Sequence, residues 1–154
     1  MFTKVMGIFY EWFYIFFSNI GVEKLARKFI ILASQKNRHQ CQNELGLKFV
    51  KEEEYLKAAK WFTKSAELGN LYGQANLAWL YYEGKGMKQN FEKALYWYEL
   101  ASDQKHAESQ YNLGYMYENG LGVCVDKLKA LELYQQSLDN GCKLAKETLI
   151  EFKT

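Results

Sequence analysis

The residues of this chain that are best suited to chemistry are its cysteines and histidines, since thiolates and imidazoles bind metals and act as nucleophiles or bases. The sequence holds three cysteines and two histidines: Cys41, Cys124, Cys142, His39 and His106. Zinc takes ligands grouped at short spacings, and only His39 and Cys41 lie close together. An odd number of cysteines without regular spacing indicates neither a zinc site nor a disulfide framework. We therefore expect reduced cysteines, no metal and no cofactor.

One stretch matches an enzymatic motif, because residues 102–105 read SDQK. The SxxK pattern carries the nucleophilic serine of penicillin-recognising enzymes, which also have SDN and KTG motifs. The sequence contains neither companion motif, and it also lacks the HExxH pattern of metalloproteases and the GxxxxGK[ST] pattern of P-loop proteins. We therefore predict no catalytic residue and a protein that is not an enzyme.

The size and charge of the chain further limit the classes of function that it can have. Its 154 residues give room for one domain of ordinary size. The composition, with 49% hydrophobic and 25% charged residues, is typical of soluble globular proteins. A net charge of +2 is too small to produce the positive field that non-specific nucleic-acid binding needs. We expect no nucleic-acid partner.

An apolar segment near the N-terminus, VMGIFYEWFYIFF at residues 5–17, is followed by a basic stretch and is similar to a signal peptide or membrane anchor. A spanning helix needs about 20 apolar residues, whereas Glu11 interrupts this shorter run. No cleavage site with small residues follows the segment. We therefore favour a packed helix and a cytoplasmic location. The alternative is a protein that is exported or membrane-associated through residues 1–20.

An internal repeat sets the elements that would position any functional residue. Residues of the same or similar type recur 36 positions later: Gln74, Asn76, Leu77, Gly84, Gly86, Lys93 and Ala94 are followed by Gln110, Asn112, Leu113, Gly120, Gly122, Lys129 and Ala130. Within each unit the apolar residues have helical spacing. The glycines follow a first helix, where a left-handed cap favours them, and Asn90 and Asp126 stand where a second helix should begin. A two-helix unit with this period predicts an all-α solenoid.

Residues 111–141, YNLGYMYENGLGVCVDKLKALELYQQSLDNG, contain the elements LGxxY, GxGV and KAxxxY in that order. Residues 75–102 show them with substitutions, and residues 45–70 keep both helices but lack the GxG. In this order the elements resemble the SEL1-like repeats, relatives of the tetratricopeptide repeats with a glycine-containing loop between the two helices.

The resemblance implies an all-α fold, an α/α superhelical solenoid of SEL1-like two-helix repeats. Three repeats are expected at approximately 39–70, 71–106 and 107–142, which together span 39–142. Residues 1–38 match the pattern more weakly, and we expect them to form a degenerate N-terminal helix pair. Residues 143–154 are expected to form a C-terminal capping helix.

Stacked two-helix units form a groove that is lined by their first helices, and such grooves bind other chains. Similarity to tetratricopeptide repeats implies that the concave positions lie two before, and two and five after, the conserved leucines Leu77 and Leu113. The first of these positions is Ala75, and Asn119 lies beside the last one. We predict six protein-binding residues: Trp79, Tyr82, Tyr111, Tyr115, Glu118 and Asn119. Aromatic residues suit an interface because they bury large areas with little loss of rotamer entropy.

The sequence therefore predicts a non-catalytic scaffold or adaptor that binds a protein or peptide partner in this groove. The resemblance also leaves an alternative, a secreted or membrane-associated hydrolase of the cysteine-rich SEL1-like type, which is β-lactamase-like. The paired cysteines of that type do not align with Cys41, Cys124 and Cys142, which favours the adaptor. Membrane association through the N-terminal apolar segment is possible in this scheme but is not favoured.

Overall fold

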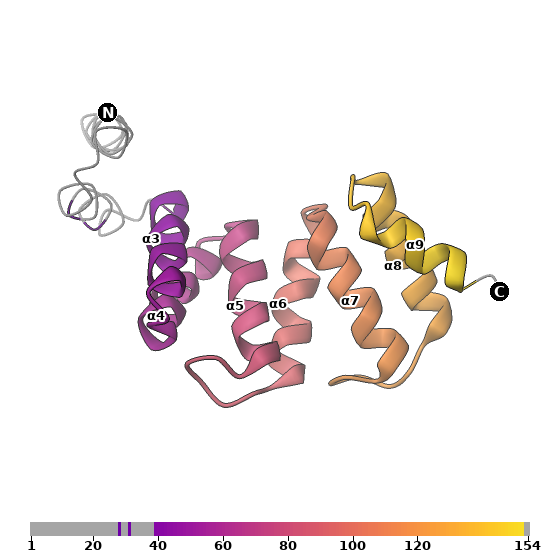
Figure 1. Ribbon diagram of the computed structural model, residues 1–154, viewed down its shortest axis with the longest axis horizontal. Coiled ribbons are helices and arrows are strands. Elements are labelled where there is room, and N and C mark those ends of the chain that lie inside the picture. Colours follow the sequence, from indigo (N-terminus) through magenta and orange to yellow (C-terminus); the bar gives the residue numbers. More distant parts are fainter. Residues whose placement is uncertain (1–27, 29–30, 32–38, 153–154) are drawn as a thin grey trace. The chain divides into compact units, whose positions relative to one another are not determined.

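The computed structural model describes Lys28, Ile31 and residues 39–152, and all regular elements of residues 39–152 are α-helices (Figure 1). In chain order they are α3 (His39–Lys51), α4 (Tyr55–Glu67), α5 (Leu71–Glu83), α6 (Phe91–Asp103), α7 (Ala107–Asn119), α8 (Lys127–Asp139) and α9 (Leu144–Glu151). The predicted all-α fold of repeated helix pairs is confirmed. The predicted N-terminal helix pair lies outside the described residues. Among the helices that are described, none is long and apolar enough to cross a membrane.

The chain divides into two compact units, the first ending at Gly73 and the second beginning at Gln74, within α5. In the first unit α3 packs on α4, and Leu45 and Phe62 are both fully buried. Gly46 is required at this contact, because a Cβ atom there would overlap the ring of Phe62. The hydroxyl of Ser65 also donates a hydrogen bond of 2.6 Å to the carbonyl oxygen of His39, which ties the end of α4 to the start of α3.

The core of the second unit is built from residues that the 36-residue period makes equivalent. Leu77 and Leu113, the conserved leucines of α5 and α7, are 1% and 4% exposed, so their predicted burial is confirmed. Leu113 packs in one hydrophobic cluster with Tyr98 and Leu133, which come from α6 and α8. Burying such side chains is the main favourable contribution to the stability of this unit.

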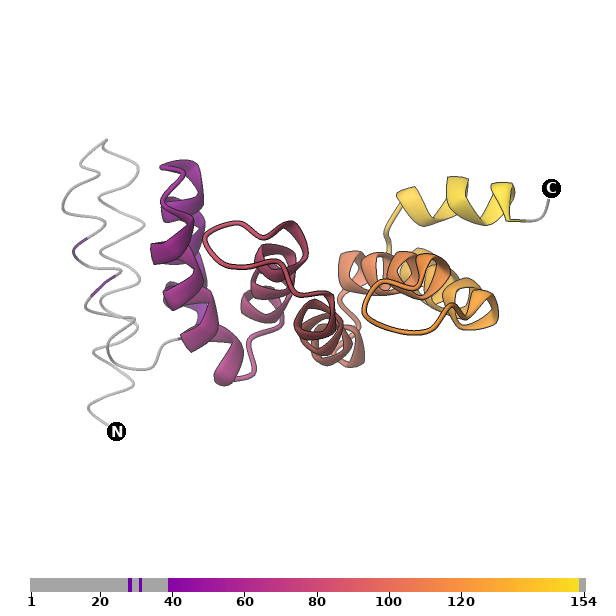
Figure 2. The ribbon, with the colours of Figure 1, turned by 90° about the horizontal axis from the view of Figure 1, so that it is seen from below.

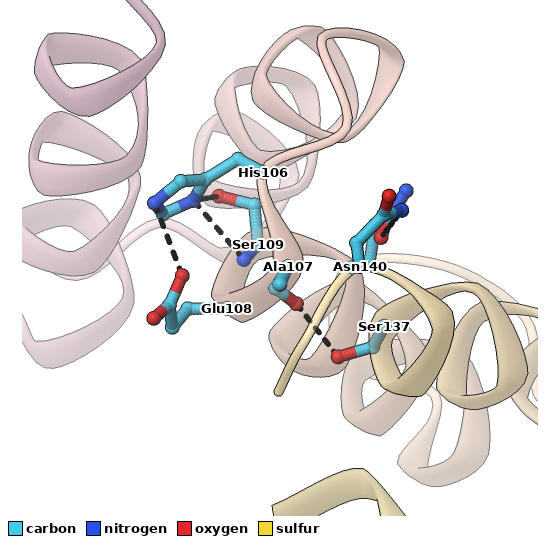
Figure 3. Close-up of polar contacts among 7 residues, drawn as sticks. His106, Ala107, Glu108, Ser109, Ser137 and Asn140 are labelled. Atoms are coloured by element: carbon cyan, nitrogen blue, oxygen red, sulfur yellow. Dashed lines mark hydrogen bonds and ion pairs between the residues drawn. The ribbon is translucent and has the colours of Figure 1, made fainter. Parts of the chain in front are cut away.

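Hydrogen bonds between polar side chains repeat with the same period. Gln104 donates a 2.7 Å bond from its amide to Gln74, and 36 residues later Asn140 donates a 2.8 Å bond to Gln110. In the same region the hydroxyl of Ser137 donates to the carbonyl oxygen of Ala107 at 2.7 Å (Figure 3). These bonds fix the ends of the second helices against the first helices.

The loops inside the helix pairs of the second unit confirm the predicted caps. The residues Gly84, Gly86, Gly120 and Gly122 all have positive φ, between 69° and 73°. The side chains of Asn90 and Asp126 accept hydrogen bonds from the backbone N–H of the third residue of α6 and α8. Both loops extend from the same end of the unit (Figure 1).

Helix α9 completes the second unit. Its residues Ala145 and Leu149 are buried, and Leu149 packs in a second hydrophobic cluster with Ala130 and Tyr134 of α8. The ring of Phe152, directly after the helix, lies 6.0 Å from the ring of Tyr134 in an edge contact. Helix α9 therefore packs on the α7–α8 pair (Figure 2).

Candidate functional site

Four of the six predicted binding residues line one cleft in the second unit. Trp79 and Tyr82 come from α5, and Tyr111 and Tyr115 come from α7. The remaining lining residues are Glu83, Tyr98 and Asn112, and the volume of the cleft is about 260 Å³. We call these seven residues the aromatic cleft.

The rings of the aromatic cleft differ in their exposure to solvent. Tyr115 is 42% exposed, and Trp79, Tyr82 and Tyr111 are half-buried. Tyr98 is the most buried lining residue, at 2% exposed. The cleft thus combines an accessible aromatic surface with a tyrosine that belongs to the core.

The hydroxyl groups of Tyr98 and Tyr82 stay protonated at neutral pH. Burial raises the pKa of Tyr98 well above its usual range, with further increases from Tyr82 and Glu83, and a hydrogen bond with Asn112 opposes the shift. The pKa of Tyr82 is raised first by burial and then by Tyr115 and Glu83. A protonated phenol is both a donor and an acceptor, so the half-buried Tyr82 can bond to the backbone of a bound chain.

A cation already lies against one ring of the cleft. The ammonium group of Lys85, in the loop after α5, lies 4.6 Å from the centroid of the Trp79 ring. Trp is the aromatic side chain that attracts cations most strongly, because the face of its ring is electron-rich. The Trp79 surface therefore has the chemistry of a cation-binding face.

The other two predicted binding residues do not line the cleft. The carboxylate of Glu118 accepts a 2.7 Å hydrogen bond from the hydroxyl of Tyr134, on α8, and it lines a separate pocket with Phe152 and others. The amide of Asn119 donates to the carbonyl oxygen of Tyr115 in its own helix at 2.9 Å. Both side chains are thus engaged within the protein.

Three residues of the cleft were not among the predicted ones. Glu83 follows Tyr82 directly and could have been found by extending the face of α5 by one residue. Asn112 recurs from Asn76 at the repeat period, so the sequence marks it as a repeat position and not as a binding residue. Tyr98 lies on a second helix, whereas the prediction counted positions only along the first helices. Its repeat counterpart Tyr134 is fully buried, so the period indicates a core residue.

A separate group of polar residues at the start of α7 has the composition of a catalytic triad (Figure 3). The Nδ1 atom of His106 lies 2.8 Å from the Oγ of Ser109, and its Nε2 atom lies 3.2 Å from a carboxylate oxygen of Glu108. Sequence analysis did not identify this group. Ser109, however, is 0% exposed, so a substrate does not reach its hydroxyl in this structure.

The group at the start of α7 caps the helix. The Nδ1 atom of His106 accepts the backbone N–H of Ser109 at 3.3 Å, as an N-cap side chain does. One repeat earlier, at 36 residues, the side chain of Asn70 accepts the backbone N–H of Gly73 at 2.8 Å in the same way. His106 therefore occupies the position of a capping asparagine.

The His106 cap predicts a pH-dependent stability. Burial lowers the pKa of His106, and Glu108 partly opposes this shift. Below the usual histidine pKa of about 6.5, the unfolded chain binds a proton at His106 that the folded chain does not. The free energy of unfolding should therefore fall as the pH decreases through this value toward the lowered pKa of the folded state.

The matched variant for this prediction is His106→Asn, which installs the cap found at Asn70. Urea unfolding at about pH 7.5 and about pH 5.5, on either side of the usual histidine pKa, gives the change for each protein. The wild type should lose more stability over this range than the variant. Equal losses would show that the His106 cap does not titrate in this way.

None of the three cysteines of the chain forms a disulfide bond in the structure. Cys41 and Cys142 are buried and Cys124 is exposed. Over the residues that the structure describes, no group of three or more His, Cys, Asp or Glu side chains is placed to hold a metal ion. These thiols do not adjoin the aromatic cleft, whose lining contains no cysteine.

Comparison with known proteins gives matches over most of the chain. A family model described as the Sel1 repeat matches residues 40–70, 71–106 and 107–142. A Sel1 repeat protein from Oxalobacter formigenes has a similar structure, with a TM-score of 0.82 and 24% identity over 91% of this chain and 57% of that one.

Two further solved structures are similar. A protective antigen present in uropathogenic Escherichia coli strains, which displays an SLR fold, gives a TM-score of 0.79 and 29% identity over 85% of this chain and 29% of that one. The cysteine-rich protein B of Helicobacter pylori gives a TM-score of 0.63 and 24% identity over 80% of this chain and 96% of that one. The chain thus spans little more than half of the length of the Oxalobacter protein and less than a third of the Escherichia coli antigen.

Proposed function

Since the chain belongs to the Sel1 repeat family, we propose that it is a non-catalytic scaffold or adaptor that binds a protein or peptide partner in the aromatic cleft. Sel1 repeat proteins generally mediate protein–protein interactions. The observation that carries the proposal for this chain is the convergence of Trp79, Tyr82, Tyr111 and Tyr115 on one cleft. These rings come from equivalent first helices of two successive repeats.

The size and lining of the cleft favour a peptide over a small molecule. Clefts that enclose drug-sized ligands usually measure about 300 to 1,000 Å³, and the aromatic cleft, at about 260 Å³, is smaller. It suits one anchoring side chain of a larger partner. Aromatic residues dominate the energetics of such interfaces, and the tyrosine hydroxyls add hydrogen-bonding groups around the anchor.

The polar group at the start of α7 supports the non-catalytic part of the proposal. Ser109 is the residue of this group that could act as a nucleophile, and it is fully buried. The ring of His106, which would have to act as its base, accepts the backbone N–H of Ser109 in the helix cap. Both side chains therefore serve the packing of α7.

Replacing Trp79 or Tyr115 with Ala should weaken partner binding by about 1 to 3 kcal/mol, the usual effect of truncating an aromatic anchor. The matched control is Tyr96→Ala, since Tyr96 is a 54% exposed tyrosine on α6 that does not line the cleft. Affinity capture from the native cell identifies the partner, and titration of the purified partner gives its Kd. The wild type and Tyr96→Ala should bind alike, with Kd about 5- to 150-fold lower than that of either cleft variant.

Circular dichroism and urea unfolding of each variant verify that the fold is retained. A partner that binds Trp79→Ala and Tyr115→Ala as tightly as the wild type would contradict the proposed site. An equal loss of partner binding in all three variants, the control Tyr96→Ala included, would show that the binding surface extends beyond the cleft.

A further inference from the structure

Acidic residues outnumber basic residues in both the first and the second helices of the second unit. The first helices α5 and α7, LYGQANLAWLYYE and AESQYNLGYMYEN, carry three acidic residues and no lysine or arginine. The second helices α6 and α8 carry five acidic residues and three lysines, Lys93, Lys127 and Lys129. The whole chain has 20 basic and 18 acidic residues, so the helices that supply the four predicted cleft residues differ in sign from the chain as a whole.

One of these acidic residues, Glu83, lines the aromatic cleft. Its charge contributes to the raised pKa of both Tyr82 and Tyr98, so the negative potential of the carboxylate extends to the hydroxyls of the cleft. In the part of the chain that the structure describes, Glu83 forms no ion pair. A carboxylate beside aromatic rings is an arrangement that attracts a cation.

The contact between Lys85 and Trp79 shows that this surface accepts an ammonium group. The Nζ atom of Lys85 lies within the distance of about 6 Å that defines a cation–π contact, at 4.6 Å from the ring centroid. The exposed ring of Tyr115 and the half-buried ring of Tyr82 supply further aromatic surface in the same cleft. The chemistry for holding a second cation is therefore present.

We propose that the aromatic cleft recognises an arginine or lysine side chain on an extended segment of the partner. The cation packs against the rings of Trp79 and Tyr115, and the carboxylate of Glu83 is its counter-ion. The inference rests on the proposed function and adds the chemical class of the residue that is recognised. It also predicts that increased salt weakens binding, because partly exposed charges are screened.

The probe that tests this inference is a phage-displayed library of random peptides, selected on the full chain. The selected peptides should share an arginine or lysine at one position. Replacing that residue with its uncharged counterpart, citrulline for arginine or acetyl-lysine for lysine, should weaken binding at least about tenfold, as expected when a charged hydrogen-bonding partner is lost.

Two substitutions that each remove one negative charge test whether Glu83 is the counter-ion. Glu83→Gln should weaken binding of the selected peptide about 3- to 30-fold, in keeping with a charge-assisted contact. Glu92→Gln is the control, since Glu92 is an exposed carboxylate on α6 that does not line the cleft. An equal effect of the two substitutions would show that binding depends only on the net charge of the protein, and it would overturn the assignment of Glu83 as the counter-ion.

The outcomes separate this inference from the proposed function. Selected peptides that lose binding to Trp79→Ala but carry no enriched basic residue, or that bind equally well with citrulline or acetyl-lysine, would overturn the inference and leave the proposed function standing. A selection that yields no peptide, or only peptides that bind Trp79→Ala as well as the wild type, would overturn both.

Discussion

Replacing Leu113 with Ala should lower the free energy of unfolding by about 2 to 5 kcal/mol, the usual effect of truncating a buried leucine. The side chain is 4% exposed and packs in a hydrophobic cluster with Ala94, Tyr98 and Met116. Truncation removes apolar surface from this cluster and leaves a cavity that helices held on both sides cannot fill completely. Urea unfolding monitored by circular dichroism measures the change.

The matched control is Leu128→Ala, because Leu128 is a 78% exposed leucine in α8 of the same unit. It should change the free energy of unfolding by less than about 0.5 kcal/mol, as surface substitutions generally do. A change of that small size for Leu113→Ala would mean that the wrong face of α7 has been assigned to the core.

Gly122→Ala should also lower the free energy of unfolding by about 2 to 5 kcal/mol, through two effects that add. Gly122 has a φ of 73°, and a left-handed backbone costs a residue with a Cβ atom about 1 to 2 kcal/mol. The added Cβ would also lie 2.6 Å from the carbonyl carbon of Phe91 and 2.8 Å from the nitrogen of Glu92. These are backbone atoms at the start of α6, and relieving such an overlap costs a further 1 to 3 kcal/mol or so.

Gly69→Ala separates these two effects. Gly69 has a φ of 81°, and a Cβ added there meets no atom within 4 Å. Only the backbone strain of about 1 to 2 kcal/mol should remain. Thermal or urea unfolding of both variants gives the difference. If Gly122→Ala were no more destabilising than Gly69→Ala, the loop after α7 would not be packed against α6 as the structure has it.

The sequence was sufficient to predict the fold because the repeat and the local rules for helices agree. The 36-residue period identifies Leu77 and Leu113 as one buried position, and the structure confirms both. The glycines and Asp126 mark the end of one helix and the start of the next, since positive φ and N-cap bonding each favour particular residue types. The short loop between α3 and α4 lacks the glycines, and there Glu53 takes the positive φ, at 57°.

The candidate site could be predicted only in part, because counting along a helix gives the face of a residue but not its partners. Tyr115 and Glu118 are both on the predicted face of α7. Glu118, however, is bonded to Tyr134 across the helix pair, a contact between residues 16 apart that no local pattern reveals. The capping role of His106 could have been found by aligning it with Asn70 at the repeat period.

Site-specific photo-crosslinking measures directly which surface of the second unit contacts the partner. The photoreactive residue p-benzoylphenylalanine is placed at position 115, in the cleft, or at position 96, on α6. The tyrosines at these positions are 42% and 54% exposed, so the two probes are similarly accessible. After irradiation with the captured partner, we expect a covalent adduct at position 115 and none at position 96. An adduct at position 96 with none at position 115 would contradict binding in the aromatic cleft.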